Sequence, residues 1–353
     1  SGNTVTTSLI PEWKASEAII LVWPHQDTDW APWLEDARQT YLSIIRIVNA
    51  NQAGVLLLCR EEDMDDVESR LTADARVMLI KADYNDTWAR DFAFLSCGNP
   101  AAPYPVEFTF NGWGNKFDAS KDNLVNQRYL APLCREKLRT STIVAEGGAL
   151  EIDDSGHLLS TASCLYNPAR NGDMSGDAYR EEFTAYLGCA QLSIFAHGHL
   201  EGDDTDGHID TLVRFTPTSG LVIQAAENRP EDSHYQGLSA LVQECAEALP
   251  DHTRYLLPLP AMFNDDGDRL PASYANYLIC NHTVLLPVYG QPEDSEAVAV
   301  MQQAFPHHEI VPVNCATLVQ QFGSLHCISM QVPCNTLKTD VIHQLNSGVT
   351  RYV

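Results

Sequence analysis

Apolar and polar positions recur along this chain in an order that predicts two adjacent strands, a helix and a further strand. In residues 149–162 two apolar runs flank a Ser-Gly pair, residues 177–188 have helical spacing, and residues 190–196 are again apolar. Short apolar runs on either side of a turn signal are typical of a hairpin, and Ser-Gly favours the positive φ angles of a tight turn. The segment is therefore predicted to be one ββαβ unit.

The same order returns in later and earlier parts of the chain. Two further units are predicted at residues 210–226, 234–249 and 253–259, and at 276–289, 295–305 and 308–314. Less regular copies are predicted from strands at 18–24, 54–60, 76–81, 90–97, 104–110 and 141–145, and from helices at 34–52, 62–71 and 124–138. This period indicates about five pseudosymmetric units in a single α/β domain. We expect that domain to cover residues 3–353, because Ser1 and Gly2 are typical of an expression scar.

Polar motifs follow the strand ends of this pattern. The segment NDTWARD (85–91) follows the strand at 76–81, and EGG (146–148) follows the strand at 141–145. The loop HGHLEGDDTDGHID (197–210) follows the strand at 190–196, and FGSLHC (322–327) follows the last repeat after a short helix. Equivalent strand ends arranged in a ring would bring these loops to one central cleft. The side chains expected to meet there are Asp86, Trp88, Asp91, Glu146, His208, Asp210 and Cys327.

Each of these residues also has an ordinary structural interpretation. His208 and Asp210 stand two apart at the start of an expected strand, so their side chains should share a face, but an isolated His-x-Asp is more often part of a plain half-solvated strand. Cys327 is one of ten singly spaced cysteines with no Cys-x-x-Cys pair and no secretory signal, so all ten are expected to be reduced. A lone cysteine is most often inert and buried. His326 is expected to pack or to bond to the backbone.

Charge and hydropathy exclude several function classes. The 47 acidic residues against 22 basic ones give a net charge of −25, which repels phosphate backbones and anionic lipid surfaces. The acidic surface either keeps the protein dissolved or draws in a cationic substrate, and charge alone does not decide between them. No apolar run reaches the roughly 20 residues of a membrane helix, and the first residues do not resemble a signal peptide. We therefore expect a cytoplasmic protein with neither a nucleic-acid nor a membrane partner.

Metal and nucleotide sites fit the sequence poorly. A calcium loop beginning at Gly202 would place Val213 where a bidentate glutamate is needed. His197, His199 and His208 lie near aspartates but form no recognised zinc ligand set, and no phosphate-binding glycine fingerprint occurs. No cofactor and no metal are expected.

The remaining thiol, imidazole and carboxylates are suited to covalent attack on a planar cation such as a guanidinium. Two aspartates can hold its N–H groups bidentately while a thiolate attacks its carbon from above. A histidine could protonate the departing ammonia and then activate water.

Eight segments together resemble the guanidine-modifying (pentein) superfamily, and most closely agmatine deiminases and bacterial peptidylarginine-deiminase-like proteins. They are PEWKASEAIILVWP, NDTWARD, FNGWGNKF, EGGALEID, NPARN, DDTDGHID, PASYANY and HCISMQ, in the order of that family and across nearly the whole chain. The resemblance implies a five-bladed α/β propeller around a central active site, metal-free hydrolysis, and conversion of agmatine to N-carbamoylputrescine and ammonia in putrescine biosynthesis. It also implies Cys327 as nucleophile, His208 as acid and base, Asp91 and Asp210 as guanidinium ligands, and Glu146 as support for the histidine. A homodimer is common in the family.

The substrate's far end is less defined, because the chain has FGSLHC and Asp204 and Asp206 where agmatine deiminases carry a glycine-rich run and Glu and Asn. Carboxylates before His208 favour an amine tail, with Asp204 as its expected partner and Trp88 as a flat face beside it. Asp86 is also expected to line the substrate site. Free, methylated or peptidyl arginine stays an alternative substrate, since Arg90 could turn inward and bind a carboxylate. A pentein that only binds its ligand and a zinc amidohydrolase also stay open, although a zinc enzyme would leave Cys327 unexplained.

Overall fold

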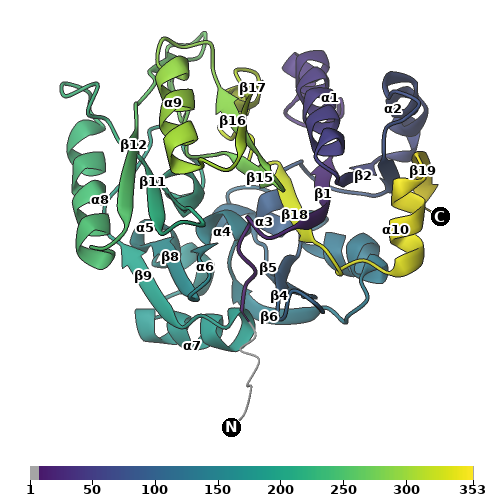
Figure 1. Ribbon diagram of the computed structural model, residues 1–353, viewed down its shortest axis with the longest axis horizontal. Coiled ribbons are helices and arrows are strands. Elements are labelled where there is room, and N and C mark those ends of the chain that lie inside the picture. Colours follow the sequence, from purple (N-terminus) through teal and green to yellow (C-terminus); the bar gives the residue numbers. More distant parts are fainter. Residues whose placement is uncertain (1–7, 353) are drawn as a thin grey trace.

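The computed structural model describes residues 8–352, and within them an α/β architecture follows the predicted repeat. The interpretation of Ser1 and Gly2 as an expression scar lies outside the described residues. In Figure 1 the longer helices lie toward the outside of the molecule and the strands toward its middle.

Within residues 8–352, four three-stranded sheets share one arrangement, in which the first strand is antiparallel to the second and the second is parallel to the third. Their strands are β4 (Leu95–Cys97), β5 (Tyr104–Thr109) and β6 (Arg139–Val144); β7 (Glu151–Ile152), β8 (His157–Thr161) and β9 (Gln191–Phe195); β10 (Val213–Phe215), β11 (Gly220–Gln224) and β12 (Thr253–Leu257); β15 (Leu278–Cys280), β16 (Thr283–Val288) and β17 (Glu309–Asn314). Helices α7 (Gly176–Leu187), α8 (Tyr235–Ala248) and α9 (Asp294–Ala304) connect the parallel strands in the last three sheets. The three ββαβ units predicted from residues 149–314 are confirmed.

A five-stranded sheet joins the two ends of the described chain. Its order is β18 (Ser329–Pro333), β1 (Ser16–Val22), β2 (Gly54–Cys59), β3 (Val77–Lys81) and β19 (Val349–Tyr352). Helices α1 (Leu34–Ala50), α2 (Met64–Arg70) and α10 (Thr339–Asn346) accompany these strands, and Figure 1 shows the purple and yellow ends of the chain side by side. Because β18 is antiparallel to β1, it repeats the ββαβ order with a first strand taken from the far end of the sequence. This pairing holds the segment after Cys327 against the N-terminal segment.

The core follows from strands that are buried on both faces. Every residue of β2 is buried, and six of the seven residues of β1 are buried, which is typical of parallel strands covered on two sides. Helix α1 buries one stripe, including Tyr41, Ile44 and Val48, against this sheet.

Three predicted elements are wrong in whole or in part. The strand expected at 90–97 begins only at Leu95, because Ala89–Phe92 form a single helical turn. The helix expected at 124–138 is a series of short turns, Asp122–Leu124, Asn126–Leu130 and Ala131–Leu133, and the backbone is extended at Cys134. Pro132 cannot donate the hydrogen bond that would continue a helix through this point. His208 and Asp210 do not begin a strand, because Ile209–Thr211 form a 3₁₀ turn and β10 starts only at Val213.

Short elements occupy the connections. They are α3 (Ala89–Phe92), α4 (Gly112–Asn115), α5 (Ala162–Leu165), α6 (Pro168–Asn171), the hairpin β13 (Met262–Phe263) and β14 (Arg269–Leu270), and the 3₁₀ turns Ala31–Trp33, Glu61–Asp63, Gly147–Ala149 and Leu318–Gln321. None of the helices in residues 8–352 is both long and apolar enough to cross a membrane.

Candidate active site

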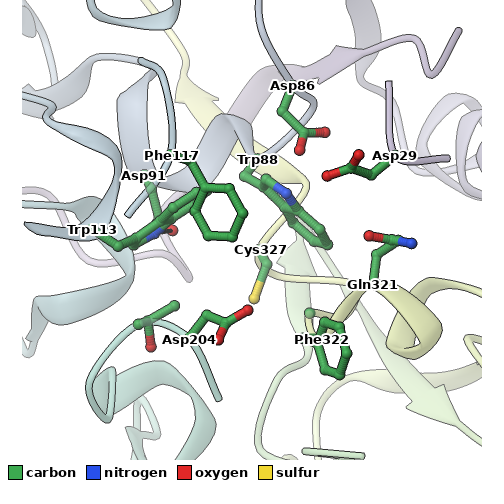
Figure 2. A pocket seen from close by; sticks show the side chains of 12 residues that line it. Asp29, Asp86, Trp88, Asp91, Trp113, Phe117, Asp204, Gln321, Phe322 and Cys327 are labelled. Carbon is green, nitrogen blue, oxygen red and sulfur yellow. Dashed lines mark hydrogen bonds between the residues drawn. The ribbon is translucent and has the colours of Figure 1, made fainter. Parts of the chain in front are cut away.

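Cys327 lies in a pocket that the predicted polar loops enclose. The pocket has a cavity volume of about 140 Å³ and is lined by Asp29, Asp86, Trp88, Asp91, Trp113, Phe117, Asp204, Thr205, Gln321, Phe322, Gly323 and Cys327. Figure 2 shows the sulfur atom of Cys327 between Trp88 and Asp204, with Asp91 and Trp113 to one side. An adjoining hollow shares Cys327 and includes His208, Asp210 and Asn276. Glu146 lies behind His208, with which it forms a hydrogen bond.

Loops that follow four strands position these groups. Asp91 lies in the single-turn helix α3 after β3, and Glu146 precedes a 3₁₀ turn after β6. His208 precedes and Asp210 lies within the 3₁₀ turn Ile209–Thr211 between β9 and β10. Cys327 follows the turn Leu318–Gln321 after β17. The backbone N–H of Arg90 donates to the carbonyl of Cys327 (3.2 Å), which ties the first loop to the last.

His208 is held by a buried carboxylate and an arginine behind it. Its Nε2 lies 2.8 Å from Glu146 Oε1, and Arg170 donates to both oxygens of Glu146. Burial alone would raise the pKa of Glu146, but His208 and Arg170 lower it to about 2. Burial likewise opposes the charge on His208, yet Asp91, Cys164 and Glu146 raise its pKa well above the usual value. The histidine is therefore held as an imidazolium.

Asp91 is oriented by two donors that the sequence alone did not indicate. Trp113 Nε1 donates to Oδ2 (2.9 Å), and the backbone N–H of Gly148 donates to Oδ1 (3.0 Å). His208 Nδ1 lies 3.6 Å from the same Oδ1. Burial, with help from Asp210, raises the pKa of Asp91 to about 6 although His208 lowers it. Trp113 sits in a turn, Gly112–Asn115, in which all four residues have positive φ, so a strained backbone aims this indole.

Asp210 has one oxygen engaged and one free. His326 Nδ1 lies 2.8 Å from Oδ2, whereas Oδ1 is buried and has no hydrogen-bond partner in the described structure. Burial would raise the pKa of Asp210, but His326 and His208 hold it below the usual value. The expectation that His326 only packs or bonds to the backbone is wrong, because its imidazole lies between the carboxylates of Asp210 and Glu12.

The Cys327 thiol is buried and faces carboxylates. Its exposed fraction is 9%, and its Sγ lies 3.4 Å from Asn276 Oδ1. Burial and the charges of Asp210 and Asp91 raise the pKa of the thiol well above the usual value. All ten cysteines fall within residues 8–352 and are free thiols, and Cys327 alone among them lines the pocket. A cation placed between the two aspartates would favour the thiolate.

The outer part of the pocket is aromatic and acidic. Trp88, Phe117 and Phe322 form flat walls, and Figure 2 shows the carboxyl groups of Asp29 and Asp86 directed toward one another. Burial, together with Asp29, raises the pKa of Asp86 to about 6. No basic residue lines this pocket in the described structure.

The acidic loop before His208 contributes fewer free carboxylates than its sequence indicates. Asp204 lines the pocket, whereas Asp206 is paired with Arg170 and Lys116. Asp203 accepts hydrogen bonds from the backbone N–H groups of Thr205 and Gly207 and so holds the loop in shape. Asp204, the residue of this loop that was expected to contact an amine tail of the substrate, therefore lines the Cys327 pocket.

Arg90 does not turn into the pocket. Its side chain is buried behind the site, where Nε donates to the carbonyl of His326 (3.3 Å). The arrangement that would have let Arg90 receive a substrate carboxylate is therefore absent from the described structure.

Several residues of the site were missed from the sequence. Glu12, Asn276 and Arg170 lie within the segments PEWKASEAIILVWP, PASYANY and NPARN, so those segments carried a signal although no role was assigned to these positions. Asp29 lies in a loop after β1 that no pattern singled out.

One group of side chains could in principle hold a metal ion. The ligand atoms of Glu146, Cys164 and His208 all lie within 4.8 Å of one another. Both oxygens of Glu146 already accept from Arg170, whose charge would oppose a cation there. The arrangement fits a hydrogen-bonded ion cluster better than a metal centre.

Comparison with protein families gives one model covering most of the chain. The family described as Porphyromonas-type peptidyl-arginine deiminase matches residues 8–333. Among curated proteins, a putative agmatine deiminase of Vibrio parahaemolyticus is 28% identical and aligns over 91% of this chain and 95% of its own length. Agmatine deiminase of Pseudomonas aeruginosa is 27% identical over 91% of this chain and 94% of its own.

Solved structures of similar proteins share the architecture. A putative arginine deiminase from Porphyromonas gingivalis superposes with a TM-score of 0.87 at 38% identity, covering 94% of this chain and all of that one. A Cys-to-Ser variant of C. jejuni agmatine deiminase with substrate bound has a TM-score of 0.85 at 30% identity, with 94% and 97% coverage. An amidinotransferase from Microseira wollei, at 13% identity and a TM-score of 0.60, shares the fold alone.

Proposed function

Because this chain belongs to the Porphyromonas-type peptidyl-arginine deiminase family, we propose that it is a cysteine hydrolase of guanidinium groups and that its substrate is agmatine. The observation that carries the proposal is the placement of the Cys327 thiol with Asp91 and Asp210 around one pocket whose outer wall is acidic. Carboxylates on both sides of a thiol suit a planar cation with N–H groups directed to each side.

The free acceptor positions define how a guanidinium would bind. Asp210 Oδ1 is buried without a partner, and a guanidinium N–H satisfies it at the same time as it adds an opposite charge. Asp91, already fixed by Trp113 and Gly148, accepts from the other side. The guanidinium carbon then faces the Cys327 sulfur.

The reaction proceeds by addition and elimination at that carbon. The substrate cation lowers the pKa of the Cys327 thiol, which loses its proton to solvent, and the thiolate forms an S–C bond to give a tetrahedral adduct. The imidazolium of His208 donates its proton to one nitrogen, the C–N bond breaks and ammonia leaves. The neutral His208 then takes a proton from water as its oxygen attacks the thiouronium carbon. As the S–C bond breaks, the remaining hydroxyl proton passes to solvent, and the ureido product and the thiolate are released.

The outer pocket favours an amine over an amino acid at the far end of the substrate. Asp29, Asp86 and Asp204 line it, and a carboxylate next to them would be repelled. The ammonium of agmatine finds opposite charge there, and Trp88 offers a face to the aliphatic chain. N-carbamoylputrescine is the corresponding product, consistent with a role in putrescine formation.

Ammonia release measured across agmatine, arginine, methylated arginines and arginyl peptides tests this assignment. We expect the highest kcat/KM for agmatine. Efficient hydrolysis of free or peptidyl arginine with agmatine inert would defeat the substrate assignment while leaving guanidine hydrolysis intact, whereas ammonia release from none of them would defeat the enzyme assignment itself.

The fold supports a related proposal about architecture. We infer that the repeated sheets are the five blades of a pentein propeller within one domain at residues 3–353, with the blade of β1, β2 and β18 closed by the two chain ends. The support is the strand order that four sheets share and the fifth reproduces across those ends.

We also propose a cytoplasmic location and a homodimeric assembly. Ten free thiols suit a reducing cytosol, and a homodimer is expected from the resemblance. Sedimentation analysis of the purified chain tests the dimer.

A further inference from the structure

The imidazole of His326 is held by two carboxylates that come from opposite ends of the sequence. Its Nδ1 lies 2.8 Å from Asp210 Oδ2 and its Nε2 lies 2.6 Å from Glu12 Oε1. Their exposed fractions are 2% for His326, 1% for Asp210 and 8% for Glu12, so water supplies little of this hydrogen bonding.

Counting donors fixes the protonation of this group. A neutral imidazole has one N–H, and ionised carboxylates only accept, so two such contacts need both ring nitrogens protonated. Glu12 also accepts from Arg214 and from the backbone N–H of Ile279, contacts that suit an ionised carboxylate. Both ring nitrogens of His326 are thus occupied by carboxylate contacts, so neither is free to act as a base for the adjacent Cys327.

Other contacts fix the carboxylate of Glu12 in place. The backbone N–H of Ile279 donates to Glu12 Oε2 (2.7 Å), and Arg214 donates to Oε1 (3.0 Å). Arg214 also bonds to Glu151, while Arg90 lies 3.9 Å from Glu12 and donates to the carbonyl of His326. Three carboxylates thus face three cations within one buried cluster.

We propose that His326 is a positioning residue, which as an imidazolium fixed by Glu12 clamps Asp210 Oδ2 and thereby leaves Oδ1 directed at the substrate guanidinium. The inference rests on the proposed function, in which Asp210 is a guanidinium ligand. Through Glu12 the clamp is tied to the segment before β1, and Glu12 in turn accepts from Ile279 in β15.

The segment that carries the nucleophile is fastened to the same cluster. The backbone N–H of His326 donates to Asn276 Oδ1 (3.0 Å), and Arg214 donates to the carbonyls of Ala275 (2.9 Å) and Tyr277 (2.7 Å) on either side of Asn276. The clamp on Asp210 and the placement of Cys327 therefore share one support.

The protonation state can be measured on the unaltered protein. In the full-length chain labelled with ¹⁵N-histidine, we expect the His326 ring, assigned by its loss in His326→Gln, to show two protonated nitrogens, because each nitrogen faces a carboxylate. A neutral tautomer would overturn the proposal, and this readout does not depend on any substrate.

Binding and turnover test the positioning role. In a Cys327→Ala background, His326→Gln should weaken agmatine binding roughly 10- to 100-fold, the effect expected for a lost charge-assisted hydrogen bond that orients a ligand. With the cysteine present, the same change should raise KM and lower kcat. Glu12→Gln, which keeps shape but removes the charge that demands the second proton, should show a smaller loss in the same direction.

His157→Gln is the matched control, because His157 is also a buried histidine but bonds to Ser193 and lies outside the charged cluster. We expect its binding of agmatine to stay within about twofold of the parent. Equal losses in His157→Gln and His326→Gln, or unchanged binding in His326→Gln, would overturn the positioning role. If the parent enzyme released no ammonia from agmatine, the proposed function would fail instead. The ¹⁵N measurement would still show whether both ring nitrogens of His326 are protonated.

Discussion

At the scale of single residues, the surroundings of Asp91 and Asp210 shift the pKa values of the two carboxyl groups in opposite directions. Asp210 is held ionised by His326, whereas burial raises the pKa of Asp91 to about 6. Asp210 is thus ready to accept a cation at neutral pH, whereas Asp91 becomes protonated as the pH falls through about 6. Guanidinium affinity should therefore depend on pH through Asp91.

We expect an alkylguanidine that lacks the amine to bind the Cys327→Ala variant about tenfold more weakly for each pH unit below about 6. Protonation of Asp91 removes the charge that the guanidinium needs, while the amine-free ligand avoids the titration of Asp86. Calorimetric titration between about pH 8 and pH 5 measures this. An affinity that stays constant across that range would mean that Asp91 is not the titrating ligand.

Asp204→Asn tests the outer pocket. The variant should lower kcat/KM for agmatine about tenfold, the order expected for one hydrogen bond to a charged group, and should spare the amine-free alkylguanidine. Glu201→Gln on the same loop is the control, since Glu201 bonds to Ser233 and does not line the pocket. Equal loss for both substrates would show that Asp204 supports the loop and does not read the amine.

At the scale of elements, tight turns bring the reactive groups together. In the 3₁₀ turn Gly147–Ala149, a Cβ on Gly148 would lie 2.6 Å from His208 Nδ1 and 2.7 Å from Asp91 Oδ1. The φ angle of Gly148 is not in the left-handed region. Glycine is therefore needed there for the close approach of these groups and not for the backbone conformation.

Gly148→Ala should consequently reduce kcat/KM at least 100-fold, because the methyl group displaces two groups that must stay within about 0.5 Å of their working positions. Gly237→Ala is the control, because Gly237 lies in α8 with open space where a Cβ would stand. Alanine there should stabilise the helix by about 1 kcal/mol and leave activity intact. Steady-state rates and thermal unfolding of both variants distinguish local displacement from general loss of folding. Normal activity in Gly148→Ala would contradict the geometry of the site.

The repeat could be predicted from sequence because each unit's pattern is local. Apolar runs, a Ser-Gly or Asn-His turn and helical spacing lie close together within each unit. The partners of β18 and β19 could not be found this way, since β18 pairs with β1 and β19 with β3 across most of the chain. Glu12 was missed for the same reason: its contact with His326 joins residues 314 positions apart.

At the scale of the whole molecule, the net charge of −25 favours arrival of a cation over that of any anion. If this field steers agmatine, kcat/KM should fall as salt rises, because exposed charges are screened beyond about 8 Å at physiological ionic strength, while kcat at saturation stays nearly constant. Stopped-flow binding across a salt series measures the effect. An association rate independent of salt would assign the surface charge to keeping the protein dissolved.

We propose that Cys327, alone among ten thiols, bonds covalently to the substrate carbon. Rapid acid quench of the enzyme during agmatine turnover, followed by intact-mass and peptide mass spectrometry, tests it most directly. We expect an adduct with the mass of agmatine less ammonia on Cys327, none in Cys327→Ser, and an unchanged adduct in Cys334→Ser. An adduct on another cysteine, or turnover that survives Cys327→Ser, would contradict it.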